Sequence, residues 1–356
     1  MQIRDRRVRM VVVILLIALI GAATYYVVTP LAADRQHALA LQALERYEYR
    51  EAADHVEKSL WWRPGNANVH LLAAQTARRR GNFQELNRLS HLAVKAGAPR
   101  QSVETELRLF AIQLGDMTHA PGLLQQCDAN PTSPEATLGY EVIFEGSLNS
   151  TQLVLARQAI DSWLKHRPGK FDQAHALVWR GRLHQISGDL PQAIADYQSS
   201  LELVPDHTEA HFRLADTLIR EDSRKAVQHV ALLSARHPND VEVRLLSVRL
   251  RRTLGQLEEA ERLAVKLLES APDHVHGLIE RGRIAMDLRK PSEAEPFLRR
   301  AMTLSPNFRE GCLAMADCLR QLDQVDEAKY FQDKAKTIED ILKKKQDESS
   351  RGKGKG

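Results

Sequence analysis

The stretch that decides the fold is GDLPQAIADYQSSLELVPDH, residues 188–207, because its frame returns as GQLEEAERLAVKLLESAPDH at residues 255–274. Gly, Leu, Ala, Leu, Glu and a closing Pro-Asp-His recur at matching places, although most other letters differ. A frame that recurs in this way indicates an internal structural repeat.

Prolines that follow apolar segments give the period of this repeat. In the C-terminal half they are separated by 33, 34 and 34 residues, at Pro205, Pro238, Pro272 and Pro306. Pro64, Pro134 and Pro168 fit the same spacing with small slips. The unit is therefore about 34 residues long, and the two quoted stretches lie two units apart.

The spacing of apolar residues within each unit indicates two helices. Within 174–205, apolar residues recur every three or four positions from Leu177 to Leu183, and again from Ala193 to Leu201. This spacing is the period of an α-helix with one buried face. We expect two antiparallel helices in each unit.

Small residues and breakers mark the places where these helices meet and end. Gly181 and Ala193 have small side chains where two helices must approach closely. Gly188 gives the backbone conformational freedom at the turn. Pro205 cannot continue a helix, and Asp206 after it can cap the next one.

The unit resembles the tetratricopeptide repeat (TPR), whose units carry small residues in both helices, Gly or Asp at the turn and Pro after the second helix. The resemblance is specific in 174–205, 241–272 and 275–306, good in 33–64 and 67–98, fair in 207–238 and 309–340, and weak in 101–171. It implies an all-α fold, a right-handed superhelical solenoid of about eight or nine stacked antiparallel helix pairs, because one pair cannot bury its own apolar face.

The expected organisation follows from these units. It comprises a basic N-terminal flank (1–9), a transmembrane anchor (10–29), TPR-like repeats (33–98), irregular TPR-like repeats (101–171), TPR-like repeats with a capping helix (174–340) and a disordered basic tail (343–356). NPTSPEA and GSLNS interrupt the pattern in 101–171, which is interpreted as a bend between two arrays.

The N-terminal segment favours a membrane anchor. No charged residue occurs from Met10 to Ala33, and about 20 apolar residues suffice to span a bilayer. The arginines before it favour a cytoplasmic N-terminus and an extracytoplasmic body at the cell (inner) membrane. A cleaved signal peptide with an apolar core of Val11–Ile20 is the alternative. The apolar run continues beyond Ala23 through Val28, which favours the anchor.

The charge distribution argues against nucleic-acid binding. The net charge is +4, but Lys and Arg are in excess at both chain ends, so the body between is slightly acidic. A nucleic-acid binder carries its positive charge on the folded part.

The resemblance implies a partner-binding groove, because in the TPR family the first helix of each pair lines the inner face. Carried over position by position, the groove residues are Val178, Arg182, Phe212, Leu245, Arg249, Arg252, Ile279, Arg283, Leu313 and Arg320. An apolar strip beside arginines suits an extended or helical protein segment with apolar anchors and acidic groups. The alternative is a solvated face whose arginines have i,i+4 partners.

Other candidate sites favour structural roles. His274 and His276 form an HxH pair, but His207 and His274 share the Pro-Asp-His junction, so no metal is expected. Trp61 and Trp62 either touch lipid headgroups or, as we favour, pack against the next repeat. Three cysteines without a CxxC pair give no zinc signal, and Cys127 is expected in the core.

No catalytic motif occurs, so neither enzyme activity nor a cofactor is expected. The predicted function is a membrane-anchored scaffold or assembly factor that binds a protein partner. Two alternatives stay open: a periplasmic chaperone or assembly module for an exported protein, and a regulatory subunit of an enzyme carried on another chain. The partner and the oligomeric state do not follow from the sequence.

Overall fold

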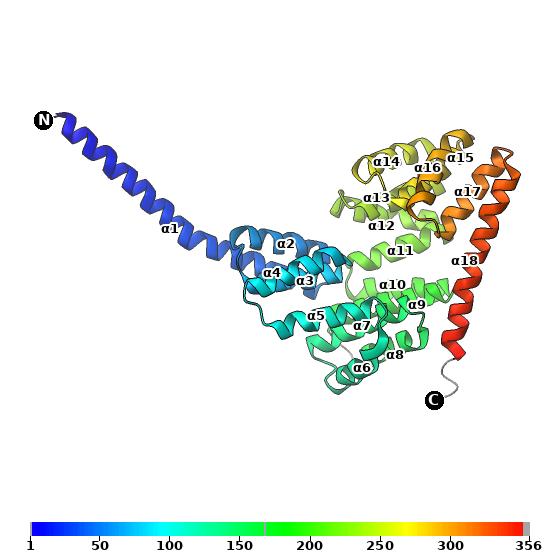
Figure 1. Ribbon diagram of the computed structural model, residues 1–356, viewed down its shortest axis with the longest axis horizontal. Helices are drawn as coiled ribbons and strands as arrows, with labels where there is room; N and C mark the ends of the chain where they lie inside the picture. The colour runs from blue at the N-terminus through cyan, green and yellow to red at the C-terminus, as the bar shows by residue number, and fades with distance from the viewer. Residues whose placement is uncertain (1, 167–168, 352–356) are drawn as a thin grey trace. The chain divides into compact units, whose positions relative to one another are not determined.

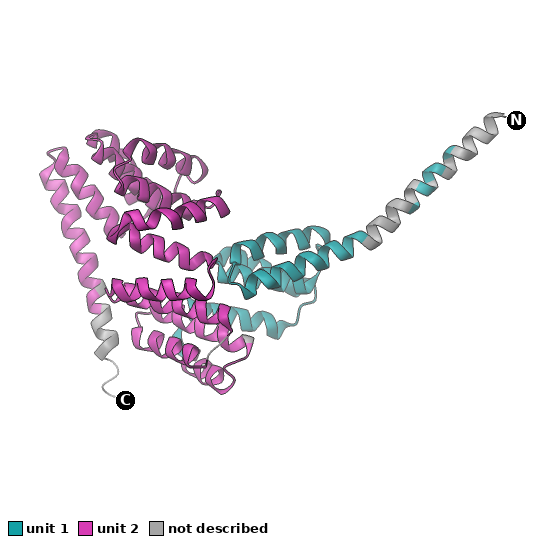
Figure 2. Cartoon of the chain, turned by 180° about the vertical axis from the view of Figure 1, so that it is seen from behind, with its two compact units in different colours: residues 1–118 teal, residues 119–356 magenta. Residues whose placement is uncertain are grey.

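The computed structural model describes residues 2–166 and 169–351. Over these residues the secondary structure is entirely helical, with eighteen α-helices and one 3₁₀ turn (Figure 1). The chain divides into two compact units, Met1–Thr118 and His119–Gly356 (Figure 2). The predicted all-α repeat fold is confirmed, and the boundary between the units falls within the stretch expected to be irregular.

Unit 1 contains two helix pairs and a fifth helix. The helices are α1 (Gln2–Glu45), α2 (Tyr49–Trp62), α3 (Ala67–Arg79), α4 (Phe83–Lys95) and α5 (Arg100–Gln113). Its core combines small residues such as Ala40, Ala52 and Ala74 with Val56 and Leu86, all buried. The alanines let the helix axes approach, and the larger side chains fill the space between them.

A buried ion pair connects α3 to α5 within unit 1. Arg78 Nε donates to Glu106 Oε2 at 2.9 Å, and both side chains are buried. Gln75 donates a further hydrogen bond to Glu106 at 3.2 Å. A buried charge requires such partners, because it has lost its water.

Unit 2 contains α6 followed by six helix pairs. The helices are α6 (Ala120–Ala129), α7 (Pro134–Asn149), α8 (Leu153–Lys165), α9 (Lys170–Ile186), α10 (Leu190–Leu203), α11 (Thr208–Glu221), α12 (Ser223–Arg236), α13 (Val241–Thr253), α14 (Leu257–Ser270), α15 (Val275–Asp287), α16 (Pro291–Leu304), α17 (Arg309–Gln321) and α18 (Val325–Arg351). The stretch 101–171 thus holds most of α5 and all of α6, α7 and α8.

Glycines on first helices allow the second helix of the pair to approach. A Cβ atom at Gly181 would lie 2.5 Å from the ring of Tyr197, and one at Gly282 would lie 2.6 Å from Leu298. The expected close approach at Gly181 is therefore present.

Most turns between paired helices use one residue in the left-handed region. Glycine takes this place at Gly81, Gly188 and Gly255, with φ of +70°, +82° and +75°. Other residues take it in four turns, at Tyr47, Thr151, Arg289 and Asp323. The turn between α11 and α12 consists of Asp222 alone, with φ of −153°, and this is where the repeat is one residue short.

Two local expectations differ from the structure. The residue that caps α11 is His207 rather than Asp206, because the His207 Nδ1 atom accepts the Ala210 amide at 3.2 Å. The tail expected to be disordered from residue 343 is helical to Arg351. Gly and Pro are missing from α18, and Lys343 pairs with Glu339 at 2.9 Å, which favours continuation of the helix.

The predicted anchor falls within α1. Considering only what the structure describes, we find no helix that combines the length and apolarity needed to cross a bilayer. Most side chains of segment 10–29, including those of 20–27, lie outside the described residues. The anchor therefore stays a prediction.

Candidate functional site

The first helices of the pairs in unit 2 form a continuous face. Each of α9, α11, α13 and α15 contacts the next first helix along the chain, ending at α17. We call this the first-helix face. All ten predicted groove residues lie on these five helices.

The predicted apolar strip is mostly core rather than surface. Val178, Leu245 and Ile279 are buried between neighbouring helices. Phe212 and Leu313 are only partly buried and keep some exposed surface. An incoming side chain can therefore reach these two apolar positions but not the other three.

Ion pairs neutralise Arg249, Arg252, Arg283 and Arg320. Arg249 pairs with Asp216 of the preceding first helix. Arg252 Nε donates to Glu280 Oε2 at 2.8 Å, and Arg283 Nη1 donates to Glu280 Oε1 at 2.9 Å.

These pairs differ from the i,i+4 pattern of the alternative interpretation. Arg249 and Arg252 reach across to a neighbouring repeat, whereas Arg283 and Arg320 pair with acids three residues earlier. Arg249 and Arg252 therefore join repeats together, and the positive charge of all four arginines is already compensated.

Arg182 differs from these arginines. Its guanidinium carbon lies 4.3 Å from the ring centroid of Trp179, in cation–π geometry. Among the described residues, no acidic group lies within ion-pair distance of it. Burial, with repulsion from Arg213, lowers the pKa of Arg182 to about 10. A partly exposed cation without a direct ion pair can accept an incoming anion.

The acid of α11 that interacts with Arg182, Glu209, is already engaged. Glu209 Oε1 accepts a hydrogen bond from Arg213 Nε at 2.7 Å within α11. Glu209 still attracts Arg182 at longer range, as does Glu145 of α7. The region around Arg182 thus holds the two arginines Arg182 and Arg213 together with Glu209 and Glu145, and Arg213 forms a direct ion pair with Glu209.

Aromatic side chains support the position of Trp179. Its ring centroid lies 5.0 Å from that of Phe144 and 5.6 Å from that of His175. His175 also lies 3.2 Å from a Glu141 oxygen and stacks on His207 at 5.6 Å. These contacts fix the Trp179 ring and with it the surface on which Arg182 lies.

Sequence reasoning identified Arg182 but missed Trp179. The position carried over from the TPR family was the ninth of the first helix, whereas Trp179 stands at the sixth. The available signal was their separation of three residues, which brings two side chains together on one helix face.

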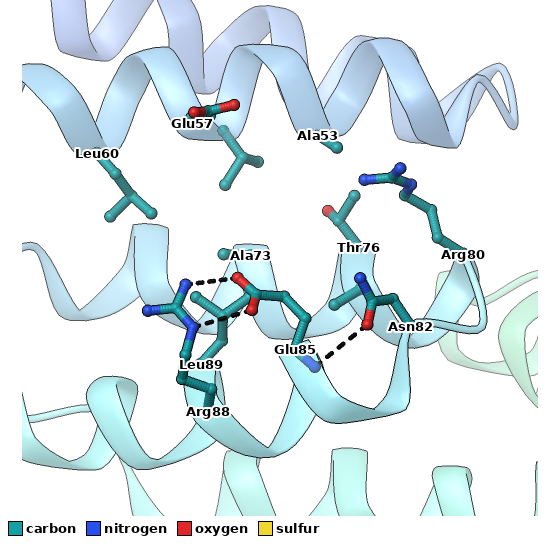
Figure 3. Close-up of a pocket in the computed structure, with 12 residues that line it drawn as sticks. Ala53, Glu57, Leu60, Ala73, Thr76, Arg80, Asn82, Glu85, Arg88 and Leu89 are labelled. Atoms are coloured by element: carbon teal, nitrogen blue, oxygen red, sulfur yellow. Dashed lines mark hydrogen bonds and ion pairs between the residues drawn. The ribbon is translucent and has the colours of Figure 1, made fainter. Parts of the chain in front are cut away.

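Unit 1 has a separate small pocket over α3, between α2 and α4 (Figure 3). It encloses about 300 Å³, with Ala53, Ala73 and Ala77 among its apolar lining. On its rim, Arg88 Nε donates to Glu85 at 2.9 Å, and this bond lowers the pKa of Glu85. Its residues were not predicted, since the groove assignment considered only first helices of the C-terminal repeats.

His274 of the candidate metal pair has a structural role as the N-cap of α15. His274 Nδ1 accepts the Gly277 amide at 3.2 Å, and its Nε2 lies 3.1 Å from Glu242. Within the described part of the chain, no group of three or more His, Cys, Asp or Glu side chains is placed to hold a metal. The cysteines are unpaired and buried, including Cys127, which is in the core as expected.

Comparisons with known proteins agree with this architecture. Residues 180–226 and 245–307 match the family model for the tetratricopeptide repeat. A solved tetratricopeptide repeat protein from Parabacteroides merdae is similar over 80% of this chain and 99% of its own, with 14% identity and a TM-score of 0.51. No match is found among curated proteins.

Two further solved structures are similar over part of the chain. A TPR protein of Thermus thermophilus is 20% identical over 50% of this chain and 97% of its own, with a TM-score of 0.44. YrrB, described as a TPR protein with an unusual peptide-binding site, is 16% identical over 54% of this chain and 96% of its own, with a TM-score of 0.40.

The matched stretches are therefore tetratricopeptide repeats, and the likeness to the Parabacteroides protein shows the same type of fold over most of the chain. Tetratricopeptide repeats mediate protein–protein interaction.

Proposed function

We propose that this protein is a membrane-anchored scaffold or assembly factor that binds a segment of a partner protein on the first-helix face of unit 2. Binding is centred on Arg182, not spread over the whole arginine strip. The protein performs no chemistry of its own and needs no cofactor.

The observation that supports this proposal is that Arg182 differs from the other arginines in its ion pairing. It rests over Trp179 without an ion pair among the described residues, whereas Arg249 and Arg252 are paired to neighbouring first helices. A carboxylate that binds Arg182 gains a charge-assisted hydrogen bond without first breaking an existing ion pair.

The chemistry of the partner follows from the surroundings of this arginine. Phe212 lies on the adjacent helix α11 and is partly exposed. A segment with Asp or Glu near an aliphatic or aromatic residue can satisfy both positions. An extended segment and a helix can each present such a pair.

The anchor part of the proposal rests on segment 10–29, which lies within α1. The segment is uncharged and apolar. Its described large side chains are exposed, namely Met10, Val13, Ile14, Leu16, Leu19 and Val28. Apolar side chains on the outside of a helix suit a lipid environment.

A selection from a library of displayed random peptides tests the binding proposal. The full chain is the target, and Arg182→Gln and Arg320→Gln are the matched variants. We expect wild type and Arg320→Gln to enrich acidic peptides with a neighbouring apolar residue, and Arg182→Gln to lose them. Equal enrichment by Arg182→Gln would contradict the proposed site.

A further inference from the structure

The register between α1 and α2 is fixed by two contacts at the end of α2. Ser59 Oγ donates to the Ala33 carbonyl oxygen at 3.0 Å, and Arg63 Nη1 donates to Asp34 Oδ1 at 2.9 Å. The two helices run antiparallel, so the last turn of α2 lies beside residues that directly follow the apolar segment of α1.

Exposed apolar side chains gather at this level. The exposed fractions are 73% for Trp61, 66% for Leu31 and 47% for Val28. The ring of Trp61 lies edge to face with that of Trp62, with centroids 4.5 Å apart. The expectation that the tryptophans pack against the next repeat is therefore wrong for Trp61, which stays open to its surroundings.

The helix rise places this group of side chains at a defined depth. Twenty residues, 10–29, span about 30 Å at 1.5 Å per residue, which matches the hydrocarbon thickness of a bilayer. Residues 30 and 31 then fall at the boundary between acyl chains and headgroups. Tryptophan is enriched at this boundary, because its ring is apolar while its N–H is polar.

Cationic groups accompany the tryptophans. Lys58 on α2 and Arg35 on α1 are both exposed and lie within about one turn of the contacts that fix the register. Positive side chains just outside the hydrocarbon region are attracted to anionic lipid headgroups.

We propose that Trp61, with Trp62 and Leu31, forms a second membrane contact that inserts into the headgroup boundary beside the anchor. The partner is the lipid bilayer itself. This inference rests on the proposed anchor. With this second contact, α1 and α2 both attach unit 1 to the membrane. Unit 1 therefore cannot rotate freely about α1 alone.

Depth-dependent quenching of tryptophan fluorescence tests this contact. The full chain is reconstituted into phosphatidylcholine–phosphatidylglycerol vesicles that contain lipid brominated either near the headgroup or deep in the acyl chains. We expect headgroup-proximal bromine to quench wild type more strongly than deep bromine. Trp61→Phe/Trp62→Phe is expected to lose this quenching, which can amount at most to the emission of two of the four tryptophans.

A control variant places a tryptophan farther along the same helix. Leu41 is 42% exposed and lies ten residues beyond Leu31, about 15 Å along α1. Leu41→Trp in the Trp61→Phe/Trp62→Phe background should give a tryptophan that brominated lipid does not quench.

Vesicle flotation separates failure of the contact from failure of the anchor. If the chain floats with vesicles but the double variant is quenched as strongly as wild type, the contact is disproved and the anchor stands. If the Leu41→Trp tryptophan is quenched as strongly as the native pair, the proposed depth is wrong. If the chain does not float with vesicles, both the anchor and the contact are wrong.

Discussion

Arg252 of α13 and Glu280 of α15 form an ion pair with a distance of 2.8 Å between Nε and Oε2, which connects two successive first helices of unit 2. Glu280 is buried and accepts a second hydrogen bond from Arg283. The two arginines therefore compensate one buried carboxylate. Arg252 thereby joins two repeats and Arg283 compensates Glu280 from within α15, which makes both arginines unsuitable probes of partner binding.

Removing both cations should destabilise unit 2. Arg252→Gln/Arg283→Gln leaves the Glu280 carboxylate buried without a charged partner, and breaking a buried pair in this way costs about 3–5 kcal/mol. We expect a lower midpoint of thermal unfolding, measured by circular dichroism. Arg320→Gln is the control, since its ion pair with Asp317 is more than half exposed and contributes little. Equal midpoints for the double variant and the control would contradict this role.

Gly181→Ala should weaken the packing of α9 against α10. The added Cβ would lie 2.5 Å from the Tyr197 ring. The helices must therefore shift, at a cost of about 1–3 kcal/mol. The measurement is chemical denaturation. Gly122→Ala is the matched control, because nothing lies within 4 Å of its Cβ position and alanine favours a helix. A stability loss as large in Gly122→Ala would mean that the packing explanation is wrong.

Arg289→Gly should stabilise the turn between α15 and α16. Arg289 has a φ of +64°, a conformation that costs a residue with a side chain about 1–2 kcal/mol and costs glycine little. Glycine also loses more conformational entropy on folding, which offsets part of this relief. The free energy of unfolding should therefore rise by about 0.5–1 kcal/mol. Gly188→Ala, at the corresponding turn with φ of +82°, should change the denaturation midpoint in the opposite direction. A loss of stability in Arg289→Gly would refute this account.

Acidification should destabilise unit 2 through its buried histidines. Burial, with the nearby His175, lowers the pKa of His207 to about 3. Burial also lowers the pKa of His211 and His229, whose Nδ1 atoms lie 2.8 Å apart. Between the folded and unfolded pKa values the unfolded chain binds more protons. Stability is therefore fully present above about pH 6.5 and falls as the pH decreases, by at most about 1.4 kcal/mol per pH unit for each histidine.

A variant isolates the contribution of His207. Asparagine can cap a helix N-terminus but does not titrate, so His207→Asn should keep α11 capped and reduce the slope of stability against pH between about 6.5 and 5. Denaturation midpoints across this range provide the measurement. A slope identical to that of wild type would show that His207 does not contribute.

The sequence predicted the repeat fold because its signals are local. The period of the prolines, the spacing of apolar residues and the small residue at Gly181 each act within one helix pair. The bounds of the C-terminal helices follow from them closely. The caps were harder to assign, because Asp206 and His207 can both accept a hydrogen bond, and only the backbone conformation decides which of them does.

The candidate site was less accessible to sequence reasoning, because it depends on contacts between repeats. Position alone placed Arg182, Arg249 and Arg252 in one strip. Whether each charge is compensated depends on acids 28 to 33 residues away, such as Asp216 for Arg249 and Glu280 for Arg252. Likewise, the burial of Val178 and Leu245 depends on how tightly the neighbouring helices pack.

The most direct test of the central claim is the affinity of a selected acidic peptide for the full chain, measured by calorimetry with wild type, Arg182→Gln and Arg320→Gln. Loss of a charge-assisted hydrogen bond costs about 1.5–3 kcal/mol, which corresponds to at least about a tenfold weaker affinity for Arg182→Gln. Arg320→Gln should bind like wild type. An unchanged affinity in Arg182→Gln, with the fold intact, would contradict the claim that Arg182 on Trp179 anchors the partner.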